Sequence, residues 1–201
     1  MSDLGGSELD LAVSHLRAGD LTHVEPVRAE VLGFCAAHPD ALVRSNEIAH
    51  LTGSALVVDP DTGRFVVLHH RKLDRWLQPG GHADGEGDLA GVALREAREE
   101  TGIDALEVRG PAVDLDGHEV APPGEPVHRH LDLRFVVLAP AGASAAPPPG
   151  NHESRAIRWV DAEELAELDP DESLLRLVGR GLALLDQLGR PRDTLGSPGT
   201  Q

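Results

Sequence analysis

A glycine-led segment with clustered acids, residues 80–103, limits the folds open to this chain more than any other stretch. It reads GGHADGEGDLAGVALREAREETGI. Asp88 is a residue type that caps helix N-termini, and Gly102 stands where a left-handed residue would end a helix. Between them, residues 89–101 hold good helix formers and no proline. The segment therefore predicts a glycine turn followed by a helix of about three turns.

Three carboxylates continue the apolar side of this expected helix. At about 100° per residue, Glu96, Glu99 and Glu100 fall within one third of the helix circumference. Like charges at these spacings cost about 0.2–0.5 kcal/mol per pair, and acids near a helix C-terminus oppose the macrodipole. A solvated acidic face is the ordinary meaning of such a run. A glycine turn just before the helix instead favours a site for hard cations, which prefer oxygen ligands.

The same residues resemble the signature of the Nudix hydrolases: Gly, five residues, Glu, seven residues, then Arg-Glu-hydrophobic-x-Glu-Glu-x-Gly-hydrophobic. Set on Gly81, this sequence supplies in register Arg95, Glu96, Ala97, Glu99, Glu100, Gly102 and Ile103. We call residues 81–103 the box. The family's first Glu falls on Gly87, with Glu86 and Asp88 on either side. In the family that Glu supports the loop and helix, commonly by pairing with the Arg, so the departure concerns the scaffold and catalytic strength more than the chemistry.

The resemblance implies a Mg²⁺-dependent hydrolase, with Mn²⁺ as the alternative ion. Its substrate would be a nucleoside diphosphate linked to another moiety, or a related diphosphate, cleaved at the diphosphate linkage. The metal ligands would be Glu96, Glu99, Glu100 and the carbonyl of Gly80. One of the glutamates, such as Glu96 or Glu99, or an acid from a loop would take the proton from water, while Arg95 orients the glutamates. A second hypothesis is a Nudix-like ligand-binding or regulatory module in which Gly87 has weakened catalysis.

The candidates for substrate binding outside the metal set are Arg71, Trp76, His82, His128, His130 and Glu153. Glu153 precedes the last expected strand, where family members often keep a loop acid, and otherwise it is a surface residue. The histidines could contact substrate, bind a transition metal or be structural. Arg71 is either a phosphate contact or a solvated loop charge. A base-stacking pocket would have to use one of very few rings, since the chain has only 3 Phe, 2 Trp and no Tyr. Trp76 lies beside the box in the sequence and could therefore stack on a base.

Net charge and cysteine usage limit the partners and the compartment that we expect for this protein. A formal net charge of −16 argues against nucleic acid or an anionic membrane as the main partner, since both require a basic face. A phosphorylated small molecule remains compatible if cations bridge it to the acids. The start of the sequence has no signal-like pattern, and the lone Cys35 is expected to be a buried thiol in a reducing compartment. We therefore expect a cytoplasmic protein without a membrane span, and a homodimer is consistent with the implied fold.

The remaining pattern predicts an α/β fold, which the resemblance identifies as a Nudix-type α/β/α sandwich with a mixed β-sheet and an N-terminal helical extension. We expect the extension at 1–45, the Nudix hydrolase domain at 46–188 and a disordered tail at 189–201. Helices are expected at 9–17, 26–37, 162–167 and 171–188. Strands are expected at 47–59 and 64–70, joined by a turn at 60–63, and at 76–78, 105–109, 113–120, 127–138 and 156–160.

Overall fold

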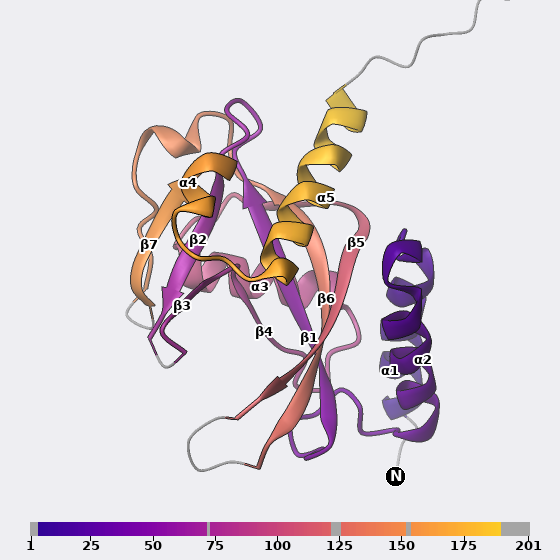
Figure 1. The fold of residues 1–201 in the computed structure, drawn as a ribbon. Helices are drawn as coiled ribbons and strands as arrows, with labels where there is room; N and C mark the ends of the chain where they lie inside the picture. Colours follow the sequence, from indigo (N-terminus) through magenta and orange to yellow (C-terminus); the bar gives the residue numbers. More distant parts are fainter. Residues whose placement is uncertain (1–3, 72, 122–125, 152–153, 190–201) are drawn as a thin grey trace, which may run out of the picture.

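The computed structural model describes residues 4–71, 73–121, 126–151 and 154–189. A mixed β-sheet lies between helices on its two faces, and two further helices stand beside one edge (Figure 1). This arrangement confirms the predicted α/β/α sandwich and its N-terminal helices. The proposed domain boundaries stay predictions, and residues 190–201 of the expected tail lie outside the described residues.

The sheet has the strand order β3-β2-β1-β6-β5, with β4 paired to β1 and β7 paired to β2. The strands are β1 (Ala49–Val58), β2 (Phe65–His70), β3 (Arg75–Leu77), β4 (Gly80–His82), β5 (Glu107–Val120), β6 (His128–Leu138) and β7 (Ser154–Val160). The pair β1 and β6 is parallel, and the other pairs are antiparallel. Because β1 is buried along its whole length and β6 along most of it, these two strands form the centre of the sheet.

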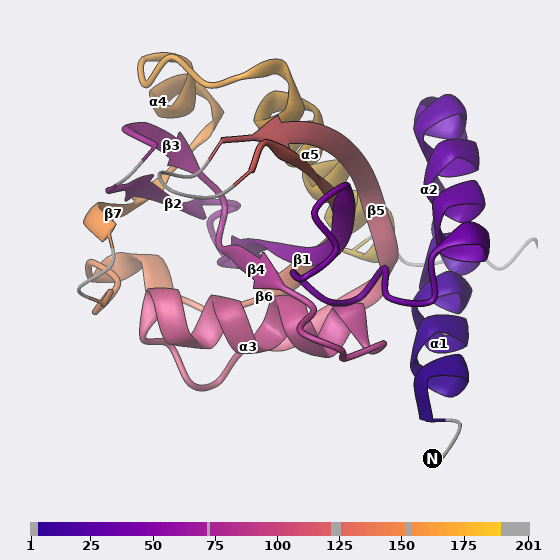
Figure 2. The same cartoon turned by 90° about the horizontal axis from the view of Figure 1, so that it is seen from below.

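Helices cover both faces of the sheet, as Figure 2 shows in a second view. The helices are α1 (Leu4–Ala18), α2 (Glu25–Ala37), α3 (Leu89–Thr101), α4 (Ala162–Ala166) and α5 (Glu172–Gly189), with short 3₁₀ turns η1 (Thr22–Val24) and η2 (Ala143–Ala145). Helix α3 packs its apolar stripe on one face of β1, and α5 packs on the opposite face. Helices α1 and α2 contact β5 and join the same core as α3. The N-terminal helices are therefore part of the packed core.

Three local predictions differ from the structure. The segment around Gly80 and Gly81, expected as a turn, is strand β4, which pairs antiparallel with β1. Neither glycine has a positive φ, so what they provide is close approach and not a left-handed conformation. The strands expected at 105–109 and 113–120 form one strand, β5, because an irregularity in the register between Arg109 and Asp114 absorbs Gly110 and Pro111. Helix α1 also begins earlier than expected, at Leu4.

Other predictions of local structure are confirmed. Helix α3 has the expected bounds, and the hairpin between β1 and β2 turns at residues 59–64. Asp161 caps α4 through a capping box, and Cys35 is a buried thiol whose pKa burial raises to about 11. Within the described part of the chain, the helices are all too short or too polar to cross a membrane.

Candidate active site

Helix α3 is placed by its two ends and its apolar stripe. The side chain of Asp88 accepts a hydrogen bond from the backbone N–H of Gly91 at 3.1 Å, which caps the N-terminus. Gly102 ends the helix with φ +71°, and its N–H donates to the carbonyl of Arg98. The buried side includes Leu89 and Val92. These contacts fix how the acidic end of the helix is turned toward the sheet.

Two of the three predicted glutamates are brought onto strand β4. The N–H of Gly80 donates to Oε2 of Glu100 at 2.9 Å. A Cβ atom added to Gly81 would lie only 2.6 and 2.7 Å from the carboxylate oxygens of Glu96. The glycine thus leaves the space that the Glu96 carboxylate fills, and the Glu96 side chain is 20% exposed. Carboxylates from two turns of α3 therefore meet the backbone of β4.

Glu99, the third predicted glutamate, is more exposed than the other two. Its side chain is exposed, while its backbone carbonyl accepts a hydrogen bond from Nδ2 of Asn151 at 3.1 Å. Asn151 belongs to the segment that leads to β7, so the acidic end of α3 is tied to that segment. The expected loop acid Glu153 lies outside the described residues.

Arg95 connects the helix to the segment before it. Its Nη2 atom donates to the carbonyl of His82 at 3.3 Å and to Oε1 of Glu96 at 3.2 Å, and Nη1 forms an ion pair with Glu86. Burial by itself would lower the pKa of Arg95, but the hydrogen bonds to Glu86 and Glu96 outweigh it and raise the pKa. The guanidinium therefore stays charged and holds the Glu96 carboxylate in place.

The predicted histidine candidates lie together on the face of the sheet opposite α3. His82, His128 and His130 form a cluster with two histidines that the sequence analysis did not single out, His50 and His118. Desolvation lowers the pKa of His50, that of His82 to about 4 and that of His130 to about 3. The imidazoles of His50, His82 and His130 are therefore neutral near pH 7.

Arg71 and Trp76 lie at the edge of the sheet formed by β2 and β3. Arg71 is exposed in the connection between these strands. The ring of Trp76 is covered by the guanidinium of Arg158, whose Cζ lies 4.3 Å from the ring centroid, and it contacts His69 edge-on. Trp76 lies on the strand that leads into Gly80, whereas Arg71 lies before that strand.

Comparison with known proteins gives the family. Residues 49–178, more than half of the chain, match the sequence model described as the NUDIX domain. The chain belongs to the NUDIX family. The match includes the whole box and every strand of the sheet, and it begins after helices α1 and α2.

Several NUDIX relatives carry names that describe phosphate chemistry. A Mycobacterium tuberculosis protein, provisionally named 8-oxo-dGTP diphosphatase 3, is 35% identical over 116 residues, which are 54% of this chain and 50% of that protein. The phosphatase NudJ of Escherichia coli K12 is 30% identical over 121 residues, covering 60% of this chain and 68% of NudJ. The chain thus spans about half the length of the first of these relatives.

Solved structures agree on the NUDIX fold. The Ap4A hydrolase of C. elegans in a binary complex has a TM-score of 0.54 at 17% identity, covering 68% of this chain and 98% of that one. The dihydroneopterin triphosphate pyrophosphohydrolase of E. coli has a TM-score of 0.52 at 22% identity, covering 67% and 95%. At these identities the likeness concerns the fold alone.

The departure from the NUDIX signature at Gly87 has a structural cause. The N–H of Gly87 donates to Oε2 of Glu8 at 2.7 Å, and a Cβ on Gly87 would overlap the backbone of Glu8. Helix α1 therefore occupies the space that a side chain at this position would need. The ion pair that the resemblance assigns to the missing Glu is made by its neighbour, Glu86. The sequence carried one signal of this, the glycine in place of the expected Glu, but nothing local pointed to α1.

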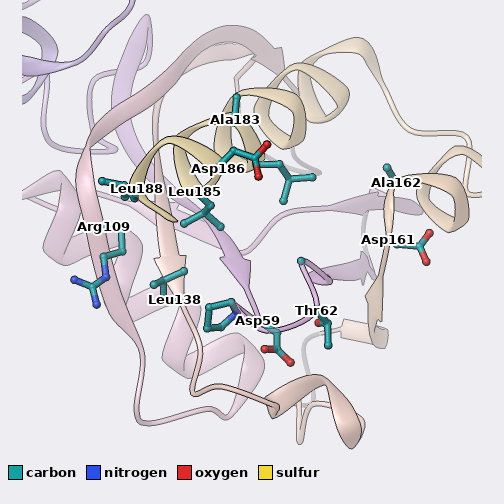
Figure 3. Close-up of a pocket in the computed structure, with 13 residues that line it drawn as sticks. Asp59, Thr62, Arg109, Leu138, Asp161, Ala162, Ala183, Leu185, Asp186 and Leu188 are labelled. Carbon is teal, nitrogen blue, oxygen red and sulfur yellow. The ribbon is translucent and has the colours of Figure 1, made fainter. Parts of the chain in front are cut away.

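A groove elsewhere on this NUDIX domain has no link to the box. Asp59, Thr62 and Asp161 line one side of it, and the C-terminal half of α5 lines the other (Figure 3). The described lining contains no box residue. The acids that meet on β4, and not this groove, are therefore the candidate catalytic centre.

Proposed function

We propose that this protein is a hydrolase of phosphoanhydride bonds, dependent on Mg²⁺ or Mn²⁺. Its substrate would be a nucleoside diphosphate linked to another moiety, or a related diphosphate. The observation that carries the proposal is the meeting of Glu96 and Glu100 on the two glycines of β4. Family membership and the names of the relatives support the reaction class.

The residues present fit a hard divalent cation. Glu96, Glu99, Glu100 and the carbonyl of Gly80 would hold it, and all of these donors are oxygens, which Mg²⁺ and Mn²⁺ prefer. The Glu96 carboxylate already lies where a Cβ of Gly81 would be, so the backbone can approach the acids closely. Bound there, the cation would neutralise the diphosphate and polarise it for attack.

The chain's own groups would orient the glutamates and take a proton. Arg95 donates to the Glu96 carboxylate through Nη2 and pairs with Glu86 through Nη1. The two contacts together orient the Glu96 carboxylate. Glu99 is exposed and is our candidate to take the proton from the attacking water. The water oxygen bonds to one phosphorus as the bridging P–O bond breaks. The other phosphate group then leaves with the bridging oxygen.

Several finer predictions remain proposals. Arg71 is proposed to contact a substrate phosphate, and Trp76 to lie beside the substrate because its strand leads into Gly80. Glu153 is proposed as an extra acid although it lies outside the described residues. The cytoplasmic location, the homodimer and the absence of nucleic-acid or membrane partners also stay predictions.

The test is turnover on a substrate panel. The full chain is incubated with Mg²⁺ and nucleotide sugars, ADP-ribose, dinucleotide polyphosphates, nucleoside triphosphates or 8-oxo-dGTP. Phosphate release is measured after phosphatase is added. We expect turnover of at least one member, and its loss in Glu99→Gln and Glu100→Gln. Glu107→Gln is the matched control, because Glu107 is an exposed acid on β5 outside the box.

Two outcomes would contradict the proposal. Turnover that persists unchanged in both box variants would remove the glutamates from the reaction. Tight binding of a panel member without turnover would instead support the ligand-binding or regulatory module. The ion pair between Arg95 and Glu86 favours the enzyme, since it replaces the contact that Gly87 cannot make.

A further inference from the structure

Five histidines gather on the face of the sheet opposite α3. They are His50 on β1, His82 on β4, His118 on β5, and His128 and His130 on β6. The strand register brings them together, because His130 pairs with His50 on one side and with His118 on the other. Ring centroids in the group lie 4.8 to 5.6 Å apart. We call these residues the histidine cluster.

The cluster and the box acids lie on opposite faces. Side chains alternate along a strand, so His50 on β1 faces away from the side of Gly53. A Cβ on Gly53 would meet the backbone of α3, at 2.7 Å from the carbonyl oxygen of Leu89. On β6, the face of His130 also carries Arg134, which donates to Ser173 of α5. The cluster therefore belongs to the α5 side, and the glutamates belong to the α3 side.

In two rings of the cluster, the Nδ1 atom lies within hydrogen-bond distance of a backbone carbonyl. Nδ1 of His50 lies 3.3 Å from the carbonyl of Asn46, and Nδ1 of His128 lies 2.9 Å from the carbonyl of Pro126. A carbonyl can only accept, so both Nδ1 atoms carry the proton and both Nε2 atoms present a lone pair when the rings are neutral. This is the arrangement seen around metal-bound imidazoles, in which the second nitrogen is fixed by a carbonyl or carboxylate.

Two Nε2 atoms of the cluster are buried without a hydrogen-bond partner in the part of the chain that the structure describes. They belong to His50 and His130, and His50 is only 1% exposed. Buried polar atoms are almost always paired, so two unpaired nitrogens on neighbouring rings point to a ligand that would bind there.

We propose that His50, His128 and His130 form a binding site for a divalent transition-metal ion of the zinc type, separate from the carboxylate site. One nitrogen from each of the three lies within 4.8 Å of the others. In a tetrahedral site with metal–nitrogen bonds of about 2.0–2.1 Å, ligand nitrogens lie about 3.3 Å apart. The three imidazoles would have to turn toward one another to close that difference. The fourth position is open to water or to His82, whose ring lies 5.0 Å from that of His50.

The donor set selects the class of ion. Imidazole nitrogens suit Zn²⁺, Ni²⁺, Cu²⁺ and Fe²⁺, whereas Mg²⁺ prefers carboxylate and water oxygens. The three ligands come from two adjacent central strands, so the site is built on the rigid part of the fold. Because the donors and the sheet face both differ, this site stands or falls independently of the proposed hydrolase.

Metal titration of the chelator-treated full chain tests the site. Zn²⁺ binding is followed by calorimetry, and Co²⁺ by the visible absorption that marks tetrahedral nitrogen coordination. We expect one ion per chain with micromolar or tighter affinity, and no competition by excess Mg²⁺. His50→Asn and His130→Asn should each weaken Zn²⁺ binding by about 100-fold or more. His38→Asn is the matched control, because its ring stacks on Phe34 outside the cluster.

A triple variant with Glu96, Glu99 and Glu100 changed to Gln separates the two sites. It should keep Zn²⁺ binding while losing any hydrolysis, so failure of the hydrolase leaves this test intact. Zinc binding that disappears in the triple variant and persists in the histidine variants overturns the proposal. A second measurement uses crystals of the unchanged protein soaked in ZnCl₂, so its result does not depend on whether the variants fold. An anomalous peak between the three imidazoles supports the site, and its absence there overturns it.

Discussion

The carboxylate of Glu8 accepts a hydrogen bond from the backbone N–H of Gly87 at 2.7 Å, which joins helix α1 to the box. A second contact lies at the next residue, Asp88, which caps α3: Nε2 of His15 lies 3.2 Å from Oδ1 of Asp88. The N-terminal extension is therefore anchored at the position where the NUDIX signature has its first Glu. The glycine that breaks the signature is also the residue that lets α1 pack.

Changing Gly87 to Ala should destabilise the protein. The added methyl group would overlap the backbone of Glu8, so α1 or the box must shift. Forcing a methyl into such a packed site costs about 1–3 kcal/mol, measured as the free energy of unfolding in urea. Gly33→Ala is the matched control, because Gly33 lies in α2 with open space around it. That change should stabilise the protein by about 0.5–1 kcal/mol. Equal effects at the two positions would show that α1 does not pack on Gly87.

Changing Glu86 to Gln should lower hydrolysis with little loss of stability. The ion pair with Arg95 is partly exposed, so its contribution to the free energy of unfolding is about 0–1 kcal/mol. Without the Glu86 carboxylate, Arg95 should be positioned less well, and so should Glu96, which Arg95 contacts. We expect kcat to fall by about 10-fold or more, which is the usual effect of removing the partner of a metal-ligand residue. Steady-state kinetics on any accepted substrate measure it. Glu107→Gln breaks a similar surface pair with Arg109 and should leave kcat unchanged.

Changing Arg134 to Met should be strongly destabilising. Arg134 is 2% exposed and pairs with Asp132 at 2.7 Å, Asp114 at 3.3 Å and Asp116 at 3.4 Å. Removing the shared cation leaves these carboxylates buried or half-buried without it, which costs about 3–5 kcal/mol in the free energy of unfolding. The control, Arg109→Met, breaks an exposed pair and should cost about 0–1 kcal/mol. A loss below about 1 kcal/mol for the Arg134 variant would mean that the network contributes no more than a surface ion pair.

Asp59 should make stability depend on pH in strong acid. Burial by itself would raise its pKa, but hydrogen bonds from Ser144, Asp61 and Gly142 outweigh it and lower the pKa from 3.8 to about 2. As the pH falls, the unfolded carboxyl takes up a proton before the folded one does. The stability that Asp59 contributes is therefore present above about pH 4 and is lost as the pH falls toward 2.

Urea unfolding of Asp59→Asn between pH 7 and pH 2 measures this contribution. The variant should be less stable than the wild type at pH 7 by about 1–3 kcal/mol, because the amide cannot accept all the bonds that the carboxylate accepts. The difference should shrink toward pH 2. Asp61→Asn, at an exposed position in the same turn, should leave the pH profile unchanged. A difference between Asp59→Asn and wild type that stays constant with pH would contradict the lowered pKa.

The sequence by itself determined the elements that depend on local interactions. Helix α3 could be predicted from end to end because its cap, its left-handed terminus and its apolar period all lie within a few residues of each other. The box and its glutamates could be found for the same reason. The turn after β1 and the capping box of α4 are equally local signals.

Only the tertiary structure decided what these elements meet. Glu96 and Glu100 reach β4 because β4 pairs with β1, and Glu8 reaches Gly87 because α1 packs beside α3. The histidine cluster depends on the register of β1 against β6, two parallel strands far apart in the sequence. A shift of one residue would turn every side chain of a strand to the other face. The burial of both strands on their two faces sets that register, and such burial arises only when the whole chain has folded.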